Sequence, residues 1–167
     1  MSDSPQNLSF SRHDHRRCVR SALSAARSLC QERGVRLTPL RQQVLELVWQ
    51  SHRPLGAYAI LDQLAEQARA GGENGRRKMA PPTVYRALEF LQENGLVHRL
   101  SSINAYLGCH HPGERHQSQF LICRGCERTV ELSDVNVGDA LAHAAAAAGF
   151  RQETTCVEIL GHCPDCR

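Results

Sequence analysis

The stretch PPTVYRALEFLQENGLVHRL, residues 81–100, decides the fold because it contains a helix with clear ends followed by an extended run. The Pro81-Pro82 pair is typical of a first helical turn, and Asn94-Gly95 is a common helix stop. Between them, apolar residues recur at helical spacing: Val84, Ala87, Leu88 and Leu91. This spacing predicts a helix with one buried face and one exposed face.

A β-hairpin is predicted directly after this helix. The runs 96–100 and 103–107 flank Ser101-Ser102, which indicates a two-residue loop between two short strands. Further helices are predicted upstream: one over about 14–33 that ends at Gly34, one that begins at Thr38-Pro39 and ends by 52–54, and one over about 57–70. Consecutive helices followed by a hairpin are typical of a winged helix-turn-helix.

The pattern changes downstream to short strands and one alanine-rich helix. The expected elements are strands over 119–122 and 129–132, a helix over about 134–148 that Gly149 stops, and a strand over about 152–160. This order predicts a small α/β domain whose sheet could pair across a two-fold axis. The fold class is therefore α+β, with an N-terminal winged helix followed by this domain.

Two Cys-x-x-Cys pairs lie within that second domain. Cys123-Arg124-Gly125-Cys126 and Cys163-Pro164-Asp165-Cys166 supply four thiolates in the spacing that tetrahedral Zn²⁺ requires. We therefore predict a four-cysteine zinc site. Redox dithiols or disulfides are the alternative, which is disfavoured because a single redox Cys-x-x-Cys pair would suffice and nothing marks a secreted chain.

Charge and hydropathy bear on compartment and partners. No run of 18 apolar residues occurs, and residues 1–12 lack the apolar segment of a signal peptide, so we expect a soluble cytoplasmic protein with no membrane partner. Residues 1–107 contain 15 Lys and Arg against 9 Asp and Glu, whereas residues 108–167 contain 5 against 8. A basic first part joined to an acidic, Cys-rich second part suggests a nucleic-acid surface beside a separate module.

The exposed face of the helix that begins at Pro81 supplies the candidate base contacts. In winged helices the N-terminal residues of the recognition helix reach base edges, which here are Thr83, Tyr85 and Arg86. Arg86 is the best candidate for bidentate recognition of guanine. Arg76, Arg77 and Lys78 are expected to bind phosphates, and Tyr58 could add a phosphate or thymine-methyl contact.

Several motifs in this order resemble the ferric uptake regulator family of bacterial metal-sensing repressors. They are RLTPLR at 36–41, PTVYRAL at 82–88 and the two Cys-x-x-Cys pairs. Within the family, the likeness is greatest to the zinc uptake regulators, through VHR at 97–99, YLGCH at 106–110 and His116 seven residues before Cys123. The resemblance covers roughly residues 20–166.

The resemblance implies two zinc ions per chain. The four-cysteine site would be structural, and a regulatory site would consist of His98, Cys109, His116 and Glu131. Two imidazoles, one thiolate and one carboxylate can form a tetrahedral Zn²⁺ site, and the thiolate disfavours Fe²⁺ or Mn²⁺. His110 or His111 could replace His116 or form a further site. The remaining cysteines, Cys18, Cys30 and Cys156, are expected to be small buried hydrophobic residues.

Arg36 and Arg41, in the first of these motifs, are also expected to contact DNA. The resemblance also implies a division into domains. The expected parts are a tail over 1–13, a winged-helix DNA-binding domain over 14–107 with a flexible loop over 71–80, a hinge and metal-binding loop over 108–117, and a dimerisation and metal-binding domain over 118–167.

The expected function is zinc-responsive repression. A zinc-loaded homodimer, held by its C-terminal domains, would bind double-stranded operator DNA and shut off zinc-uptake genes, with no catalytic residue and no small organic substrate. Three alternatives remain: an iron- or peroxide-responsive regulator of the same family, a zinc hydrolase, and a zinc-stabilised interaction module that never contacts DNA. The hydrolase is disfavoured because no His-Glu-x-x-His motif occurs.

Overall fold

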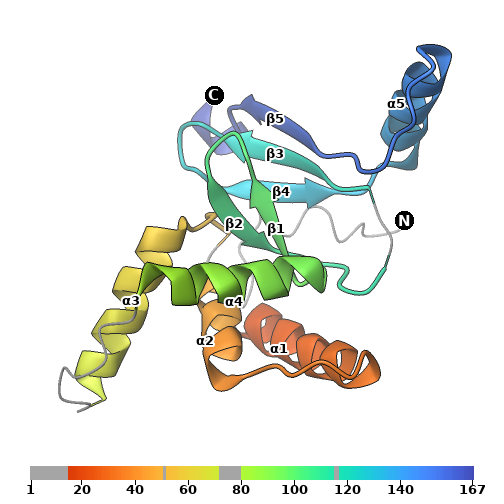
Figure 1. Cartoon of the computed structure of the whole chain (residues 1–167). Coiled ribbons are helices and arrows are strands. Elements are labelled where there is room, and N and C mark those ends of the chain that lie inside the picture. The colour runs from red at the N-terminus through yellow and green to blue at the C-terminus, as the bar shows by residue number, and fades with distance from the viewer. Residues whose placement is uncertain (1–14, 51, 72–79, 115–116) are drawn as a thin grey trace. The chain divides into compact units, whose positions relative to one another are not determined.

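A computed structural model describes residues 15–50, 52–71, 80–114 and 117–167 (Figure 1). The chain divides into two compact units between Gly113 and Glu114, called here the front unit (before the division) and the rear unit (after it). Within the described ranges, no helix is long and apolar enough to cross a membrane. Most of the loop predicted to be flexible, residues 72–79, lies outside the described residues.

The described part of the front unit contains four helices and a two-stranded sheet. The elements are α1 (His15–Glu32), α2 (Pro39–Trp49), α3 (Ala57–Ala70), α4 (Pro81–Glu93), β1 (Val97–Leu100) and β2 (Ala105–Gly108). Leu55 adds an isolated antiparallel bridge to Tyr106 of β2. The four predicted helices and the hairpin are confirmed, as is the winged helix-turn-helix that they form.

The ends of these helices follow local side-chain and backbone chemistry. Thr38 is extended, and its hydroxyl accepts a hydrogen bond from the Arg41 amide at 3.4 Å, which caps α2 before Pro39. Beyond α1 and α4, Gly34 and Gly95 have φ values of +66° and +68°. Glycine adopts this left-handed conformation without steric cost, so both helices stop where the sequence predicted.

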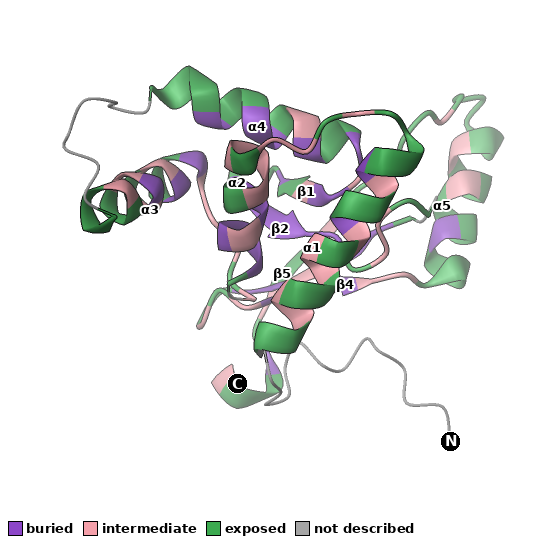
Figure 2. Ribbon diagram, turned by 90° about the horizontal axis from the view of Figure 1, so that it is seen from below, coloured by how far each residue is buried: buried purple, intermediate pink, exposed green. Residues whose placement is uncertain are grey.

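The core of the front unit forms around one face of α4. Val84, Leu88 and Leu91 are fully buried and pack with Val44 of α2 and Ile60 of α3. In Figure 2 this face of α4 is purple, for buried residues, while the rest of its first turns is green, for exposed ones. Full burial of each such side chain contributes about 1.5–3 kcal/mol, so α4 is held rigidly with its polar face outward.

The hairpin loop is longer than predicted. Leu100 pairs with Ala105, so the loop spans four residues, 101–104, and the prediction of a two-residue Ser101-Ser102 loop was wrong. The register that buries Leu100 and Ala105 leaves Ile103 outside the sheet, 38% exposed. Asn104 closes the loop with a φ of +48°, a left-handed conformation that Asn tolerates better than most residues.

The rear unit is a three-stranded mixed sheet with one helix. Its elements are β3 (Gln119–Cys123), β4 (Thr129–Leu132), α5 (Val135–Ala147), β5 (Val157–Gly161) and a short 3-10 turn (Pro164–Cys166). The strand order is β4-β3-β5, with β4 antiparallel and β5 parallel to β3. Asp134 caps α5 by accepting from the Asn136 amide at 2.8 Å. The predicted strands and helix are confirmed.

Two details of the rear unit differ from expectation. The last strand begins at Val157 rather than near Gln152, because the Gln152 side chain bonds locally to Thr155 and residues 152–156 make no ladder. Cys156 is exposed just before β5, so its prediction as a buried hydrophobic residue was wrong. Cys30 is buried as expected, and Cys18 is half-buried.

Candidate metal centres and nucleic-acid interface

The four predicted zinc ligands come together in the rear unit. Cys123 ends β3, and Cys126 follows in the turn toward β4. Cys163 directly precedes the 3-10 turn after β5, and Cys166 is the last residue of that turn. Their sulfur atoms all lie within 4.8 Å of one another, and the four residues are free thiols. The β3–β5 pairing explains this convergence, because Cys123 is in register with Gly161, two residues before Cys163.

Hydrogen bonding within this cluster gives its thiols different pKa values. The amide of Cys163 donates to Cys123 Sγ at 3.3 Å, and this bond, with that from Cys126, lowers the pKa of Cys123 to about 6. Sulfur contacts with Cys163 and Cys126 instead raise the pKa of Cys166 to about 12. Four sulfurs at this separation match the donor set of structural Zn²⁺, so the residues present fit zinc.

Arg128 supports the cluster from outside. Its Nε donates to Cys126 Sγ at 3.5 Å, and its guanidinium forms an ion pair with Asp165 at 2.8 Å. The bond from Arg128 is the main cause of the lowered pKa of Cys126. Arg128 therefore orients one ligand and offsets part of the charge that four thiolates bring together.

Replacing Arg128 by alanine is expected to weaken zinc binding at the four-cysteine site about 10-fold to 100-fold, the usual effect of losing a group that orients a ligand. Competition with a chromophoric chelator measures this affinity. Arg124→Ala is the matched control, because Arg124 is an exposed arginine of the same turn. Equal affinities in the two variants would show that Arg128 does not support the site.

Two of the predicted regulatory ligands lie together in the front unit. His98 belongs to β1 and Cys109 directly follows β2, and their ligand atoms lie within 4.8 Å of each other. The Cys109 amide donates to the Leu96 carbonyl at 3.0 Å, which extends the hairpin ladder by one step. Antiparallel pairing therefore places His98 and Cys109 on the same face of the hairpin.

The other two predicted ligands belong to the rear part of the chain. Glu131 is in β4, where its carboxylate accepts a hydrogen bond from Ser118 Oγ at 2.8 Å. His116 lies outside the described residues. Of the two alternative ligands, His110 packs its ring edge-on against Trp49, with centroids 5.0 Å apart.

The predicted base contacts lie on the exposed face of α4. Thr83, Tyr85 and Arg86 are exposed in its first turns, opposite the buried face. Tyr58, near the start of α3, is 66% exposed, and Arg36 is exposed before α2. The predicted phosphate contacts Arg76, Arg77 and Lys78 lie outside the described residues.

Arg41 differs from the other predicted contacts. Its guanidinium lies 3.5 Å from the centre of the Phe90 ring and donates to the Arg36 carbonyl at 2.6 Å. These contacts tie α2 to α4 and hold the segment before α2. The structure thus gives Arg41 a packing role, which the motif at residues 36–41 could not reveal.

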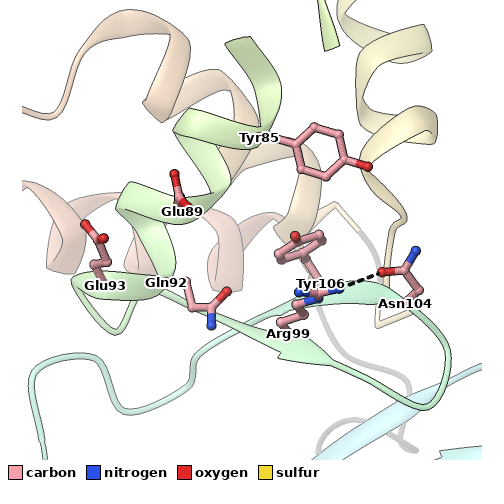
Figure 3. Close-up of a pocket in the computed structure, with 7 residues that line it drawn as sticks. All are labelled: Tyr85, Glu89, Gln92, Glu93, Arg99, Asn104 and Tyr106. Carbon is pink, nitrogen blue, oxygen red and sulfur yellow. Dashed lines mark hydrogen bonds between the residues drawn. The ribbon is translucent and has the colours of Figure 1, made fainter. Parts of the chain in front are cut away.

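A hollow of about 570 Å³ lies between α4 and the hairpin, and sequence reasoning missed it. Figure 3 shows the residues that line it: Tyr85, Glu89, Gln92 and Glu93 from α4, and Arg99, Asn104 and Tyr106 from the hairpin. Asn104 accepts a hydrogen bond from Arg99 at 3.2 Å, which orients that guanidinium. Burial raises the pKa of Tyr106, so its phenol stays neutral.

The acidic part of this hollow limits where a nucleic acid can approach. Glu89 and Glu93 line its α4 side, one and two turns beyond Tyr85. Carboxylates repel phosphates, so this side of the hollow disfavours a DNA backbone. The spacing of these carboxylates along α4 can be read from the sequence, but which hairpin residues face them depends on the tertiary fold.

Comparisons with known proteins agree with this architecture. The sequence profile of the ferric uptake regulator family matches residues 32–160. The zinc uptake regulation protein of Escherichia coli (strain K12) is 37% identical over 145 residues, which cover 86% of this chain and 80% of that protein.

Two solved structures are similar over most of both chains. The crystal structure of holo XcZur has 42% sequence identity and a TM-score of 0.75, covering 87% of this chain and 96% of that one. A zinc uptake regulator complexed with zinc and DNA has 36% identity and a TM-score of 0.77, covering 88% and 93%. With the family profile matching most of its length, this chain belongs to the ferric uptake regulator family.

Proposed function

We propose that this protein is a zinc-responsive transcriptional repressor of the cytoplasm, which binds operator DNA as a homodimer when loaded with zinc and turns off zinc-uptake genes. The observation that carries the proposal is the pair His98 and Cys109, whose ligand atoms lie within 4.8 Å at the base of the hairpin that follows α4. A thiolate beside an imidazole favours zinc over iron or manganese. A metal bound there would act on the DNA-binding unit itself.

Relatives support the same function. The similar Escherichia coli protein is named a zinc uptake regulation protein, and one similar solved structure contains zinc and DNA. The iron- and peroxide-responsive alternatives have weaker support, because the named regulators of those kinds share only 25–28% identity with this chain. No group in this proposal has a catalytic role.

Two zinc ions per chain follow from the two groups of ligands. Cys123, Cys126, Cys163 and Cys166 would hold a structural ion, and His98, Cys109, His116 and Glu131 would hold the regulatory one. His98 belongs to the hairpin and Glu131 to β4, so a bound ion that takes all four ligands holds the two units together. In this arrangement a tail over residues 1–13 precedes a DNA-binding domain over 14–107. A hinge over 108–117 and a dimerisation domain over 118–167 follow.

The rear unit offers a surface for the proposed dimer. β5 is an edge strand with Ile159 51% exposed, and an unpaired apolar edge is a template for another strand. α5 has only Gly138 buried, while Val135 is 73% exposed and Phe150, just beyond the helix, is 69% exposed. A second copy of this chain would cover these apolar groups and present two α4 helices to successive major grooves.

Within this proposal, the residues of α4 read the operator. Arg86 would donate two hydrogen bonds to a guanine, and Thr83 and Tyr85 would contact neighbouring bases or phosphates. Tyr58 and Arg36 would add contacts to the DNA, with phosphate contacts from Arg76, Arg77 and Lys78. Arg41 would lie beside this surface and position Arg36 by donating a hydrogen bond to its carbonyl.

Arg86→Ala is expected to weaken operator binding about 10-fold to 100-fold and to change binding to unrelated DNA much less, because a bidentate base contact discriminates by about 1–3 kcal/mol. Fluorescence anisotropy with operator and scrambled duplexes measures both. Arg20→Ala, on the exposed face of α1, is the control of equal charge. If both variants lose the same small amount on both duplexes, α4 does not read bases and the repressor assignment fails.

A further inference from the structure

The residues on either side of Cys109 both contact the same aromatic side chain. A β-carbon added at Gly108 would lie 2.3 Å from two atoms of the Trp49 indole, so the ring rests directly on the Gly108 backbone. The His110 ring meets Trp49 edge-on, with centroids 5.0 Å apart and planes at 66°. Cys109 therefore lies between two contacts to one rigid group.

The alternation of the hairpin explains this arrangement. Gly108 is opposite Val97 of β1, and both are buried, whereas His98 and Cys109 belong to the other face. Trp49 ends α2 and is itself only 7% exposed, within the core of the front unit. α2 therefore supports the back of the hairpin, and the ligand pair faces away from that support.

We propose that Trp49 is a positioning residue of the regulatory site: its indole, resting on Gly108 and His110, holds the Cys109 thiol next to His98. This inference rests on the proposed function, because it takes Cys109 and His98 as regulatory zinc ligands. Only glycine at 108 allows the indole to approach the backbone this closely. The edge-on contact places the His110 ring against Trp49 on the other side of Cys109.

The position of a ligand matters because a ligand that is already oriented toward the metal loses less conformational entropy when the metal binds. Losing a group that orients a ligand typically weakens metal binding 10-fold to 100-fold. Trp49→Leu keeps an apolar side chain in the core and removes the flat ring under Gly108. The expected result is zinc binding at the second site weakened about 10-fold or more, with the four-cysteine site unchanged.

The experiment uses the full-length protein with the four-cysteine site filled, and measures second-site affinity by chelator competition under conditions where every variant is folded. Leu64→Ala is the matched control, because Leu64 is a buried core residue of α3 whose truncation lowers stability, and it is not among the atoms found against Gly108. Trp49→Phe, which keeps an aromatic edge, is expected to fall between wild type and Trp49→Leu. Cobalt(II) in the second site adds a readout of the thiolate–metal bond.

A double-mutant cycle completes the test. Gly108→Ala is expected to weaken second-site zinc binding in the wild type, and to have a much smaller additional effect in Trp49→Leu, where the clashing indole is gone. Wild-type zinc affinity and cobalt spectrum in Trp49→Leu, or additive effects of the two substitutions, would overturn the positioning role. Cys109→Ser distinguishes failure of this inference from failure of the proposed function. If Cys109→Ser leaves second-site zinc affinity unchanged, the regulatory site itself is wrongly assigned.

Discussion

Cys123→Ser is expected to remove the tightly held zinc and to unfold the rear unit. Cys123 ends the central strand β3, and its sulfur accepts a hydrogen bond from the Cys163 amide. The metal site and the end of this strand therefore depend on each other. A structural zinc ion contributes an apparent ~10–16 kcal/mol to folding, which is as large as the ~5–15 kcal/mol by which most domains are stable. A three-ligand site retains only part of that free energy. Loss of the rear unit removes the proposed dimer surface and therefore operator binding.

Zinc content after dialysis, circular dichroism and sedimentation measure these three consequences together. Cys156→Ser is the matched control, because Cys156 is an exposed thiol of the same unit outside the cluster. It is expected to keep one tightly held zinc, a cooperative unfolding transition and the wild-type association state. A Cys123→Ser protein with these same properties would show that the four cysteines do not form a structural metal site.

Cys109→Ser is expected to abolish the response of operator binding to zinc while leaving the four-cysteine site occupied. Serine matches the size of cysteine but offers a poor zinc ligand, and Cys109 is 2% exposed next to His98. A regulatory ligand typically couples to DNA with about 1–3 kcal/mol, so wild-type affinity should change about 5-fold to 150-fold with zinc. The variant should remain at the weak limit at every zinc concentration.

The two proposed zinc sites are separable by this variant. Zinc content should fall from two ions per chain to one, and the unfolding transition of the rear unit should stay close to wild type. His162→Ala is a useful control, because His162 is an exposed histidine outside both groups of ligands. Loss of the tight zinc in Cys109→Ser would contradict the separation into a structural and a regulatory site.

The helices of the front unit were predictable because their ends have local causes. Thr38-Pro39, Pro81-Pro82 and Asn94-Gly95 specify caps and stops through their own backbone chemistry. α2 begins beside the first pair, and α4 begins and ends beside the other two. The four-cysteine site was predictable for a similar reason, since each Cys-x-x-Cys pair brings two ligands together within one turn. What the sequence could not show is that the pairing of β3 with β5 brings the two Cys-x-x-Cys pairs together.

Features that depend on distant residues were not predictable. The hairpin loop was placed wrongly because its register follows the burial of Leu100 and Ala105, not the local preference of Ser101-Ser102. The stacking of Arg41 on Phe90 and the contact of Trp49 with Gly108 each join segments about 50 or more residues apart. Periodicity identifies which residues are buried, but it does not identify their partners.

The proposed function requires that zinc controls the affinity of this protein for operator DNA. The most direct measurement is fluorescence anisotropy of wild-type protein on a palindromic operator duplex across a series of buffered free zinc concentrations, with the four-cysteine site filled throughout. We expect weak binding at low free zinc, a sharp gain in operator affinity over a narrow zinc range, and no comparable gain with iron or manganese. Operator affinity that is independent of free zinc would contradict the proposed function.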